Sequence, residues 1–240
     1  MNEPALLAVA HGSPDPRAEQ VLDALVARVR SERPGLVAVL SHLGFSDPSV
    51  PTALASLARQ GVREVVVVPL LLTAAYHAKV DLPGLLAQAA RDHPQLRIRQ
   101  AEVLGPHPLL FELIRRRLAE AGAEPGMSLV LAAVGTSDPG ANAALADVAA
   151  SLGGTIGFAA GSPALTDVIA GLRSRGTRQV ALATYVLAPG EFSDRLQDAG
   201  ADVVSEVLGA APEVVDVVLS RYDAAVAAGA AFLDQIKTSA

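Results

Sequence analysis

Residues 6–16 read Leu-Leu-Ala-Val-Ala-His-Gly-Ser-Pro-Asp-Pro, and this stretch predicts the type of fold. It opens with a short apolar run, as in a strand that is buried inside a sheet. The Gly12-Ser13 turn follows. Asp15-Pro16 is typical of a helix start, because aspartate caps free N–H groups and proline suits the first helical turn. A buried strand that runs directly into a helix indicates an α/β fold.

The same alternation of strand and helix continues through the first half of the chain. Apolar runs typical of strands cover residues 6–9, 37–40, 65–72 and 98–103. Amphipathic stretches typical of helices follow them at residues 17–30, 49–59, 80–90 and 109–120. This alternation predicts a parallel four-stranded sheet with helices on both faces.

The second half of the chain repeats this plan. Three pairs of segments match in the same order: residues 12–16 with 135–139, 55–63 with 170–178, and 103–108 with 207–212. We therefore expect two similar lobes, each a parallel four-stranded sheet flanked by helices. Glycine and proline interrupt the pattern at residues 122–126, so we divide the chain into domains 1–123 and 124–240.

Composition restricts the class of function. The chain has no cysteine, which excludes disulfides, thiolate metal sites and iron-sulfur clusters, so any metal must be bound by histidine or oxygen ligands. A formal net charge of −6 argues against nucleic acid as a partner. No apolar run approaches the ~20 residues of a membrane helix, and the N-terminus lacks the basic stretch of a signal peptide. We expect a cytoplasmic monomer or homodimer with no nucleic acid or membrane partner.

The five histidines all lie in the first half of the chain, and this is the main difference between the two repeats. On the pairing above, His11 falls opposite Val134 and His77 falls opposite Phe192. The second repeat retains turn glycines and prolines but lacks histidine. We interpret it as a scaffold copy, with the reactive groups confined to the first lobe.

His11 and His77 are the candidate reactive residues. His11 ends the first predicted strand, and His77 follows the third, so both are expected at the carboxyl edge of the sheet, where open parallel sheets bind ligands. If the first and third strands are neighbours, the two imidazoles could share one metal-sized site. Imidazole binds Fe(II), Co(II), Ni(II) and Zn(II), and near neutral pH it also accepts a proton. Two histidines without cysteine would hold a metal that must later be released.

Structural roles are favoured for the remaining candidates. His107, between two prolines, is expected to cap a helix, His93 to end one, and His42 to end a strand. Asp47 precedes a proline, so we favour a helix cap over a catalytic role. Residues 115–117 are three arginines, which suit a solvated helix face.

The features above together resemble the class II sirohydrochlorin chelatases. The resemblance rests on residues 7–13 (LAVAHGS), on Asp47-Pro48-Ser49, and on residues 67–72 (VVPLLL) leading through His77 to residues 81–83 (DLP). It covers residues 6–108 well and the second lobe as a degenerate echo. Members of the family often have a glutamate near the position of Asp47, or an acidic residue where this chain has Gly44. An acidic helper at Asp47 is therefore not expected.

The resemblance implies a fold, a site and a reaction. The fold is chelatase-like, with the tetrapyrrole held in the cleft between the lobes. The histidines matching His11 and His77 bind the incoming metal and help to remove pyrrole protons. The substrates are sirohydrochlorin and a divalent ion, Fe2+ or Co2+, and no nucleotide is used. We favour iron, because the chain lacks the His-rich tract often found in cobalt enzymes.

The substrate is rich in carboxylates, so its binding needs cationic side chains or helix N-termini. We assign substrate binding to six residues: Gly12, Ser13, Arg17, Lys79, Gly135 and Thr136. For Arg17 and Lys79, a solvated surface role is an equal alternative.

Other classes of function remain as alternatives. A two-lobed protein that binds a small molecule without catalysis would show the same alternating plan, because fold does not determine function. A nucleotide-dependent enzyme is disfavoured, since no Gly-x-Gly-x-x-Gly or Walker loop follows a predicted strand. A serine hydrolase using Ser13 lacks the Gly-x-Ser-x-Gly pattern.

Overall fold

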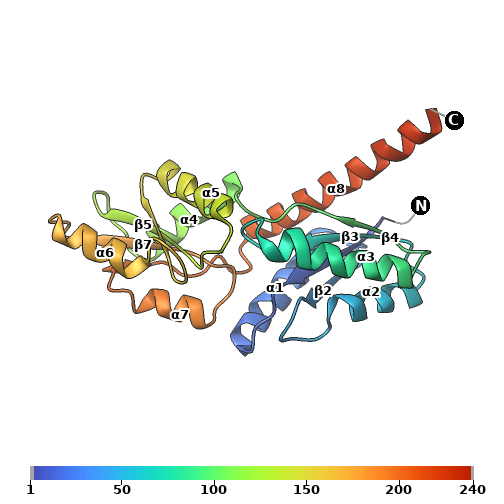
Figure 1. The fold of residues 1–240 in the computed structure, drawn as a ribbon, viewed down its shortest axis with the longest axis horizontal. Helices are drawn as coiled ribbons and strands as arrows, with labels where there is room; N and C mark the ends of the chain where they lie inside the picture. Colours follow the sequence, from blue (N-terminus) through green and yellow to red (C-terminus); the bar gives the residue numbers. More distant parts are fainter. Residues whose placement is uncertain (1–2, 239–240) are drawn as a thin grey trace. The chain divides into compact units, whose positions relative to one another are not determined.

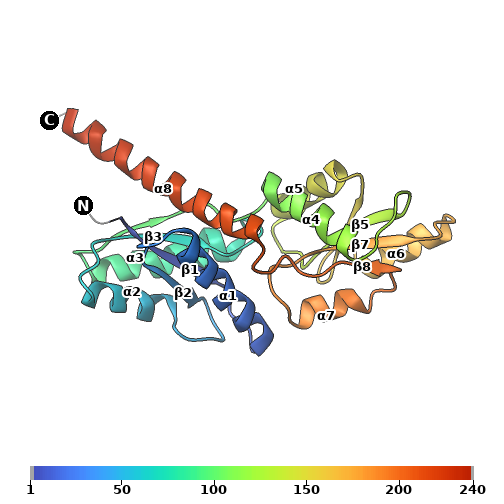
Figure 2. The ribbon, with the colours of Figure 1, turned by 180° about the vertical axis from the view of Figure 1, so that it is seen from behind.

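The chain forms two α/β units, each built on one parallel four-stranded sheet (Figures 1 and 2). This computed structural model describes residues 3–238, and the side chains of residues 3–229. Residues 1–2 and 239–240, the ends of the two predicted domains, lie outside it. The predicted α/β fold with two similar lobes is confirmed.

The first sheet contains β1 (Ala5–Ala10), β2 (Ala38–His42), β3 (Glu64–Pro69) and β4 (Arg97–Gln100). Its order is β2-β1-β3-β4, so β1 and β3 are neighbours. Val9 is level with Pro69 in the parallel pairing of these two strands. β3 ends at Pro69, three residues before the predicted end, because proline has no N–H to donate to a neighbouring strand.

Helices cover both faces of the first sheet. On one face, α2 (Val50–Arg59) and α3 (Leu82–Asp92) pack on the odd-numbered side chains of β1, such as Leu7 and Val9. The opposite face, with Leu6 and Ala8 of β1, is covered by α1 (Pro16–Glu32) and α8 (Pro212–Thr238) (Figure 2). A strand buried on both faces explains the continuous apolar run at residues 5–10.

The second sheet repeats this topology with the order β6-β5-β7-β8. Its strands are β5 (Ser128–Ala133), β6 (Thr155–Phe158), β7 (Val180–Tyr185) and β8 (Val203–Val204). Its helices are α4 (Pro108–Glu120), α5 (Pro139–Ser151), α6 (Leu165–Ser174) and α7 (Glu191–Gln197). α6 and α7 contribute Leu165, Ile169 and Leu196 to a core with β5 and β7.

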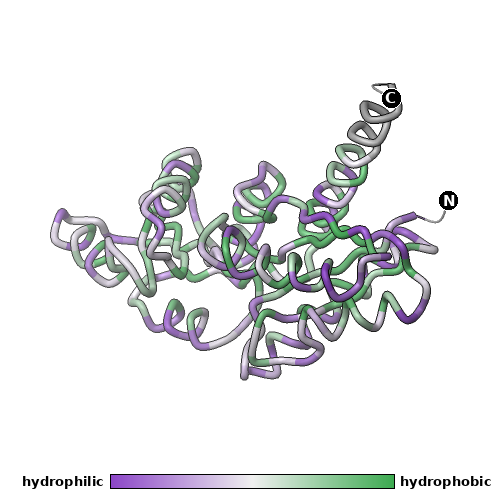
Figure 3. The backbone as a smooth tube through the Cα atoms, turned by 45° about the vertical axis from the view of Figure 1, so that its right-hand side comes forward, coloured by the Kyte–Doolittle hydropathy of each residue, from purple (hydrophilic) through white to green (hydrophobic). Residues whose placement is uncertain are grey.

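The hydrophobic residues concentrate in the strands of both units, as the colouring in Figure 3 shows. Within the described residues, no helix combines the length and the apolar character that would let it cross a membrane.

The boundary between the units differs from the predicted one at residue 123. The second unit spans Gly105–Val214, and the chain from Val215 onward belongs to the first unit again. Arg117 of α4 donates to the Leu208 carbonyl in the second unit, whereas Tyr222 of α8 donates to the Pro4 carbonyl at 2.5 Å. The last helix of each repeat thus belongs to the other repeat's unit: α4 to the second unit and α8 to the first. Similar local sequences precede both helices, so only packing decides which sheet each one covers.

The predicted cap at Asp15 is confirmed, and Asp138, its equivalent in the second repeat, is a cap as well. Asp15 caps α1 by accepting from the Arg17 N–H, and Asp138 caps α5 by accepting from two backbone N–H groups. The prediction for Asp47 is wrong. Helix α2 starts two residues later, where Ser49 is the cap, because Pro51 also suits the first turn of a helix.

Equivalent glycines follow the first strand of each unit. Gly12 and Gly135 both have φ of 90°, which favours glycine. A Cβ on Gly12 would lie 1.7 Å from the Gly44 carbonyl oxygen, and one on Gly135 would lie 2.8 Å from that of Ala160. In both repeats, therefore, two loops approach each other too closely for a side chain.

Replacing Gly12 by alanine is expected to destabilise the first unit by about 2–4 kcal/mol, from the left-handed φ and from the clash with Gly44. Gly61→Ala is the matched control, since Gly61 has φ of 82° but no atom lies within 4 Å of the place that a Cβ would take. It should cost only about 1–2 kcal/mol. Urea unfolding of both variants measures the difference, and equal midpoints would contradict the close approach.

Candidate functional site

His11 stands at the carboxyl end of β1, on the turn that leads into α1. Two hydrogen bonds hold this turn against the loop that follows β2. The Leu43 N–H donates to the Ala10 carbonyl at 2.9 Å, and the Gly44 N–H donates to the His11 carbonyl at 3.0 Å. The backbone of His11 is therefore fixed while its side chain stays exposed.

His77 lies on a turn of π-helix, η1 (His77–Asp81), which precedes α3. The Leu82 N–H donates to the His77 carbonyl, five residues back, and this closes the wide turn. π-Turns are rare and occur frequently at functional sites. The helix predicted from the sequence begins at residue 80, so His77 was expected in the preceding loop, and the structure places it in the first turn of the helical segment.

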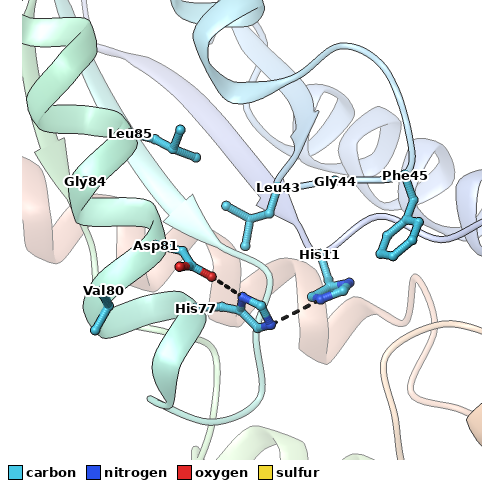
Figure 4. Close-up of a pocket in the computed structure, with 9 residues that line it drawn as sticks. All are labelled: His11, Leu43, Gly44, Phe45, His77, Val80, Asp81, Gly84 and Leu85. Atoms are coloured by element: carbon cyan, nitrogen blue, oxygen red, sulfur yellow. Dashed lines mark hydrogen bonds and ion pairs between the residues drawn. The ribbon is translucent and has the colours of Figure 1, made fainter.

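The two imidazoles meet. His11 Nε2 lies 3.2 Å from His77 Nε2, and the ring centroids are 4.6 Å apart with the planes at 77° (Figure 4). The contact follows from the pairing of β1 with β3, which brings the ends of both strands to one edge of the sheet. The expected pairing of these histidines is thus present in the structure.

The Nδ1 atom of each ring has an oxygen partner. His77 Nδ1 lies 2.6 Å from Asp81 Oδ2, and His11 Nδ1 lies 3.2 Å from the Gly12 carbonyl oxygen. An ionised carboxylate only accepts, so the His77 proton is assigned to Nδ1 and its Nε2 lone pair points toward His11. Asp81 therefore fixes the orientation and tautomer of His77.

The distance between the Nε2 atoms suits two ligands of one ion. Nitrogens bound at about 2.1 Å, at an angle of about 90–109°, lie about 3.0–3.4 Å apart. The observed 3.2 Å falls within this range. Among the described residues, no group of three or more histidine, aspartate or glutamate side chains could hold a metal ion, so the pair would leave most positions around an ion open.

A cavity of about 530 Å³ opens beside the pair (Figure 4). Its lining comes from the turn after β1, the loop after β2, the π-helical turn η1 and the start of α3: His11, Leu43, Gly44, Phe45, His77, Val80, Asp81, Gly84 and Leu85. Phe45 and Val80 were not predicted from the sequence, and no role in the site was predicted for Asp81. The spacing of His77 and Asp81, four residues apart on one helical turn, was the available signal for Asp81.

The predicted substrate-binding residues of the first unit lie around the histidines but do not line this cavity. The Ser13 hydroxyl accepts from the Asp15 N–H at 3.1 Å. Arg17 binds the Asp15 carboxylate and holds its pKa below the usual range. Lys79 is exposed on η1, two residues from His77. Their role toward a substrate stays a prediction.

In the second unit, backbone N–H groups of the predicted anion site already donate to side chains of the same segment. Asn142 accepts from the Thr136 N–H and donates to the Thr136 carbonyl at 2.7 Å. Asp138 takes the first N–H groups of α5. An anion at Gly135 and Thr136 would have to replace these contacts, so this part of the assignment also stays a prediction.

The remaining histidines have the structural positions expected of them. His42 ends β2 and is 1% exposed, with Nε2 3.2 Å from Glu19 Oε2 but not aligned for a hydrogen bond. His93 ends α3, and His107 caps α4 by accepting from the Leu109 N–H at 3.2 Å. Asp47 is exposed and lies outside the cavity lining.

The arginines at residues 115–117 lie on α4. Arg116 pairs with Glu120 and Glu213, and Arg117 pairs with Glu120. These partners belong to the second unit. Arg115 and Arg116 are exposed as expected, whereas Arg117 is half-buried.

Residues 5–121 match the CbiX family. The sirohydrochlorin cobaltochelatase of Methanothermobacter thermautotrophicus is 32% identical over 131 residues, which are 48% of this chain and 91% of that protein. The chain belongs to the CbiX family of class II chelatases. The sirohydrochlorin ferrochelatase of Bacillus subtilis is 30% identical over 136 residues. That match covers 56% of this chain and about half, 52%, of the relative.

The solved structures confirm the two-lobed chelatase fold over nearly the whole chain. The structure described as SirB from Bacillus subtilis with Fe3+ has a TM-score of 0.81 and 24% sequence identity. The superposition covers 91% of this chain and 94% of that one. The second half of the chain, which the family match does not reach, is therefore also part of the chelatase fold.

Asp81→Ala is expected to weaken Co(II) binding by about 10–100-fold, because His77 loses the carboxylate that orients it. Asp81→Asn should lose less, since an amide oxygen still accepts the Nδ1 proton. Titration with Co(II), followed by its visible absorption, measures the affinity. Asp23→Ala removes an exposed carboxylate on α1, outside the cavity, and serves as the control. Unchanged affinity in Asp81→Ala would contradict the role of Asp81.

Proposed function

We propose that this chain is a sirohydrochlorin chelatase that inserts Fe(II) for sirohaem synthesis without a nucleotide. The observation that supports this most is the approach of His11 Nε2 and His77 Nε2 to 3.2 Å at the open edge of the first sheet. The names of the relatives support the same reaction, since they are a ferrochelatase and a cobaltochelatase that act on sirohydrochlorin.

The reaction needs a site that binds a metal briefly and accepts protons. The incoming ion loses water, passes to the macrocycle nitrogens and displaces their N–H protons. His11 and His77 would hold the ion through Nε2 on the way in. Once the ion has moved to the macrocycle, the same nitrogens are free to accept the displaced protons. General-base help of this kind is typically worth about 10²–10⁴-fold.

Three features of the site suit the transfer of an ion in exchange for protons. A pair of neutral imidazoles without thiolate or carboxylate ligands leaves most of the coordination sphere to water and substrate. His11 is also exposed, so a proton taken from the macrocycle can pass to solvent. Asp81 adds negative charge behind His77, where it stabilises a protonated or metal-bound imidazole.

The peripheral carboxylates of the substrate need cationic or N–H partners. We assign Arg17 and Lys79, with the backbone of Gly12 and Ser13, to this role in the first unit, and Gly135 and Thr136 in the second. The aspartate caps at both helix starts oppose an anion there. Lys79 is therefore the strongest of these assignments, because it is exposed on the same turn as His77.

Cobalt insertion for cobalamin synthesis is the second candidate reaction. Relatives of this chain are named for either metal, and imidazole suits both ions. A role in binding a tetrapyrrole without inserting a metal is the third candidate. The same assay separates all three.

His11→Ala and His77→Ala are each expected to lower the rate of metal insertion by at least about 100-fold, because one ligand and one base are lost. Anaerobic mixing of sirohydrochlorin with Fe(II) or Co(II), followed by absorbance, measures the rate above the spontaneous reaction. His93→Ala is the matched control, since His93 lies at the far end of α3 from η1. It should keep the wild-type rate.

The metal that is inserted faster identifies the biological reaction as iron or cobalt chelation. A wild-type protein that binds sirohydrochlorin but accelerates neither ion would refute the chelatase and leave the binding role. Variants of both histidines with full activity would refute the assignment of the site.

A further inference from the structure

Exposed apolar side chains gather around the histidine pair. Among the described residues, five large hydrophobic side chains are exposed, and three of them are Phe45 (75%), Tyr76 (58%) and Val80 (51%). Phe45 and Val80 line the cavity, and Tyr76 is next to His77 in the chain. Exposed apolar groups concentrated at a site indicate a ligand with apolar surface.

Phe45 is the most exposed of these and has an unusual backbone. It is the only non-glycine residue with positive φ in the described part of the chain, at 63°. A side chain is disfavoured in this conformation, and a glycine would be accepted there without cost. The structure nevertheless presents a phenyl ring to solvent at this point.

Hydrogen bonds tie the Phe45 loop to the turn that contains His11. The Gly44 N–H donates to the His11 carbonyl, and the Ser46 hydroxyl donates to the Ser13 carbonyl at 3.2 Å. The phenyl ring stacks on the imidazole of His11, with centroids 5.8 Å apart and planes at 26°. Figure 4 shows Phe45 on the side of His11 that faces away from His77. Phe45 and His11 are thus positioned as one group.

The second repeat provides an internal comparison. Its equivalent loop is closed by the same backbone hydrogen bond. The Phe158 N–H donates to the Pro163 carbonyl, as the His42 N–H donates to the Pro48 carbonyl in the first repeat. Four residues lie between Phe158 and Pro163, and they include no aromatic side chain. The hydrogen bond that closes the loop therefore forms without a phenyl ring in the loop. The longer loop with Phe45 occurs in the repeat that has the histidines.

We propose that Phe45 is a substrate-binding residue that contacts the face of the tetrapyrrole macrocycle beside His11. This inference rests on the proposed function and extends it to the apolar part of the substrate. An imidazole whose Nε2 points at the centre of the macrocycle stands upright on it, because the lone pair lies in the ring plane. Phe45, tilted by only 26° from His11, would stand upright as well and meet the macrocycle with its edge. Edge-to-face contact is favourable between aromatic systems.

Binding of metal-free sirohydrochlorin, measured by its fluorescence, tests this contact. Phe45→Ala is expected to raise Kd about tenfold, which is the effect of one well-placed aromatic contact. The Kd of Phe45→Leu should lie between those of the wild type and Phe45→Ala, since leucine keeps apolar bulk without a ring. Phe45→Gly relieves the positive φ, so its equal loss of affinity would exclude misfolding as the cause.

Val37→Ala is the matched control. Val37 is an exposed apolar residue of the same unit, but it precedes β2, at the opposite edge of the sheet from the histidines. Its Kd should stay within about twofold of the wild type. Insertion by Phe45→Ala at saturating sirohydrochlorin should keep kcat within about threefold, with the loss in KM, because the ring takes no part in proton transfer.

Wild-type affinity in Phe45→Ala would overturn the inference while the chelatase function stands. If kcat is lowered while Kd is unchanged, Phe45 only orients His11. A wild-type protein that binds no sirohydrochlorin would refute the proposed function itself, and the inference with it.

Discussion

The parallel pairing of β1 with β3 is the constraint on which the candidate site depends. With Val9 level with Pro69, the chain leaves both strands at one edge of the sheet. His11 needs only the turn after β1, whereas His77 is reached through a short connection and the wide turn η1. This turn places His77 and Asp81 together, and the carboxylate directs Nε2 of His77 at His11. The strand register, the π-helical turn and the tautomer of His77 therefore all favour the contact between the two imidazoles.

The two units show what the scaffold requires and what the site adds. Gly12 and Gly135 have the same φ and the same close approach of a neighbouring loop, and aspartate caps the following helix in both. These features persist without histidine, so they belong to the fold. The first unit adds the paired imidazoles, Asp81 and the loop of Phe45. Its open edge thereby combines the polar groups proposed to hold an ion with the apolar groups proposed to contact the macrocycle.

The exchange of the last helices has a consequence for the first unit. Its sheet is completed by α8, which comes from the end of the chain, and Tyr222 of α8 is fully buried. The Arg33 side chain pairs with Asp223 and Glu3, which ties α1, α8 and the residues before β1 together. The unit with the histidines therefore depends on both ends of the sequence. A division of the chain at residue 123 would separate α8 from the sheet that it covers.

The sequence by itself determined the alternation of strand and helix, the internal repeat and the position of His11 and His77 at strand ends. Apolar periodicity, turn glycines and Asp-Pro helix starts are local signals, and they predicted the elements of the first half of the chain within a few residues. The sheet that each last helix covers, the π-turn at His77 and the cap at Ser49 were decided by tertiary structure. So were the positions of Asp81 beside His77 and of Phe45 beside His11. These depend on contacts between segments far apart in the chain, or on a choice between nearly equal local turns, and neither is encoded in the period of a single segment.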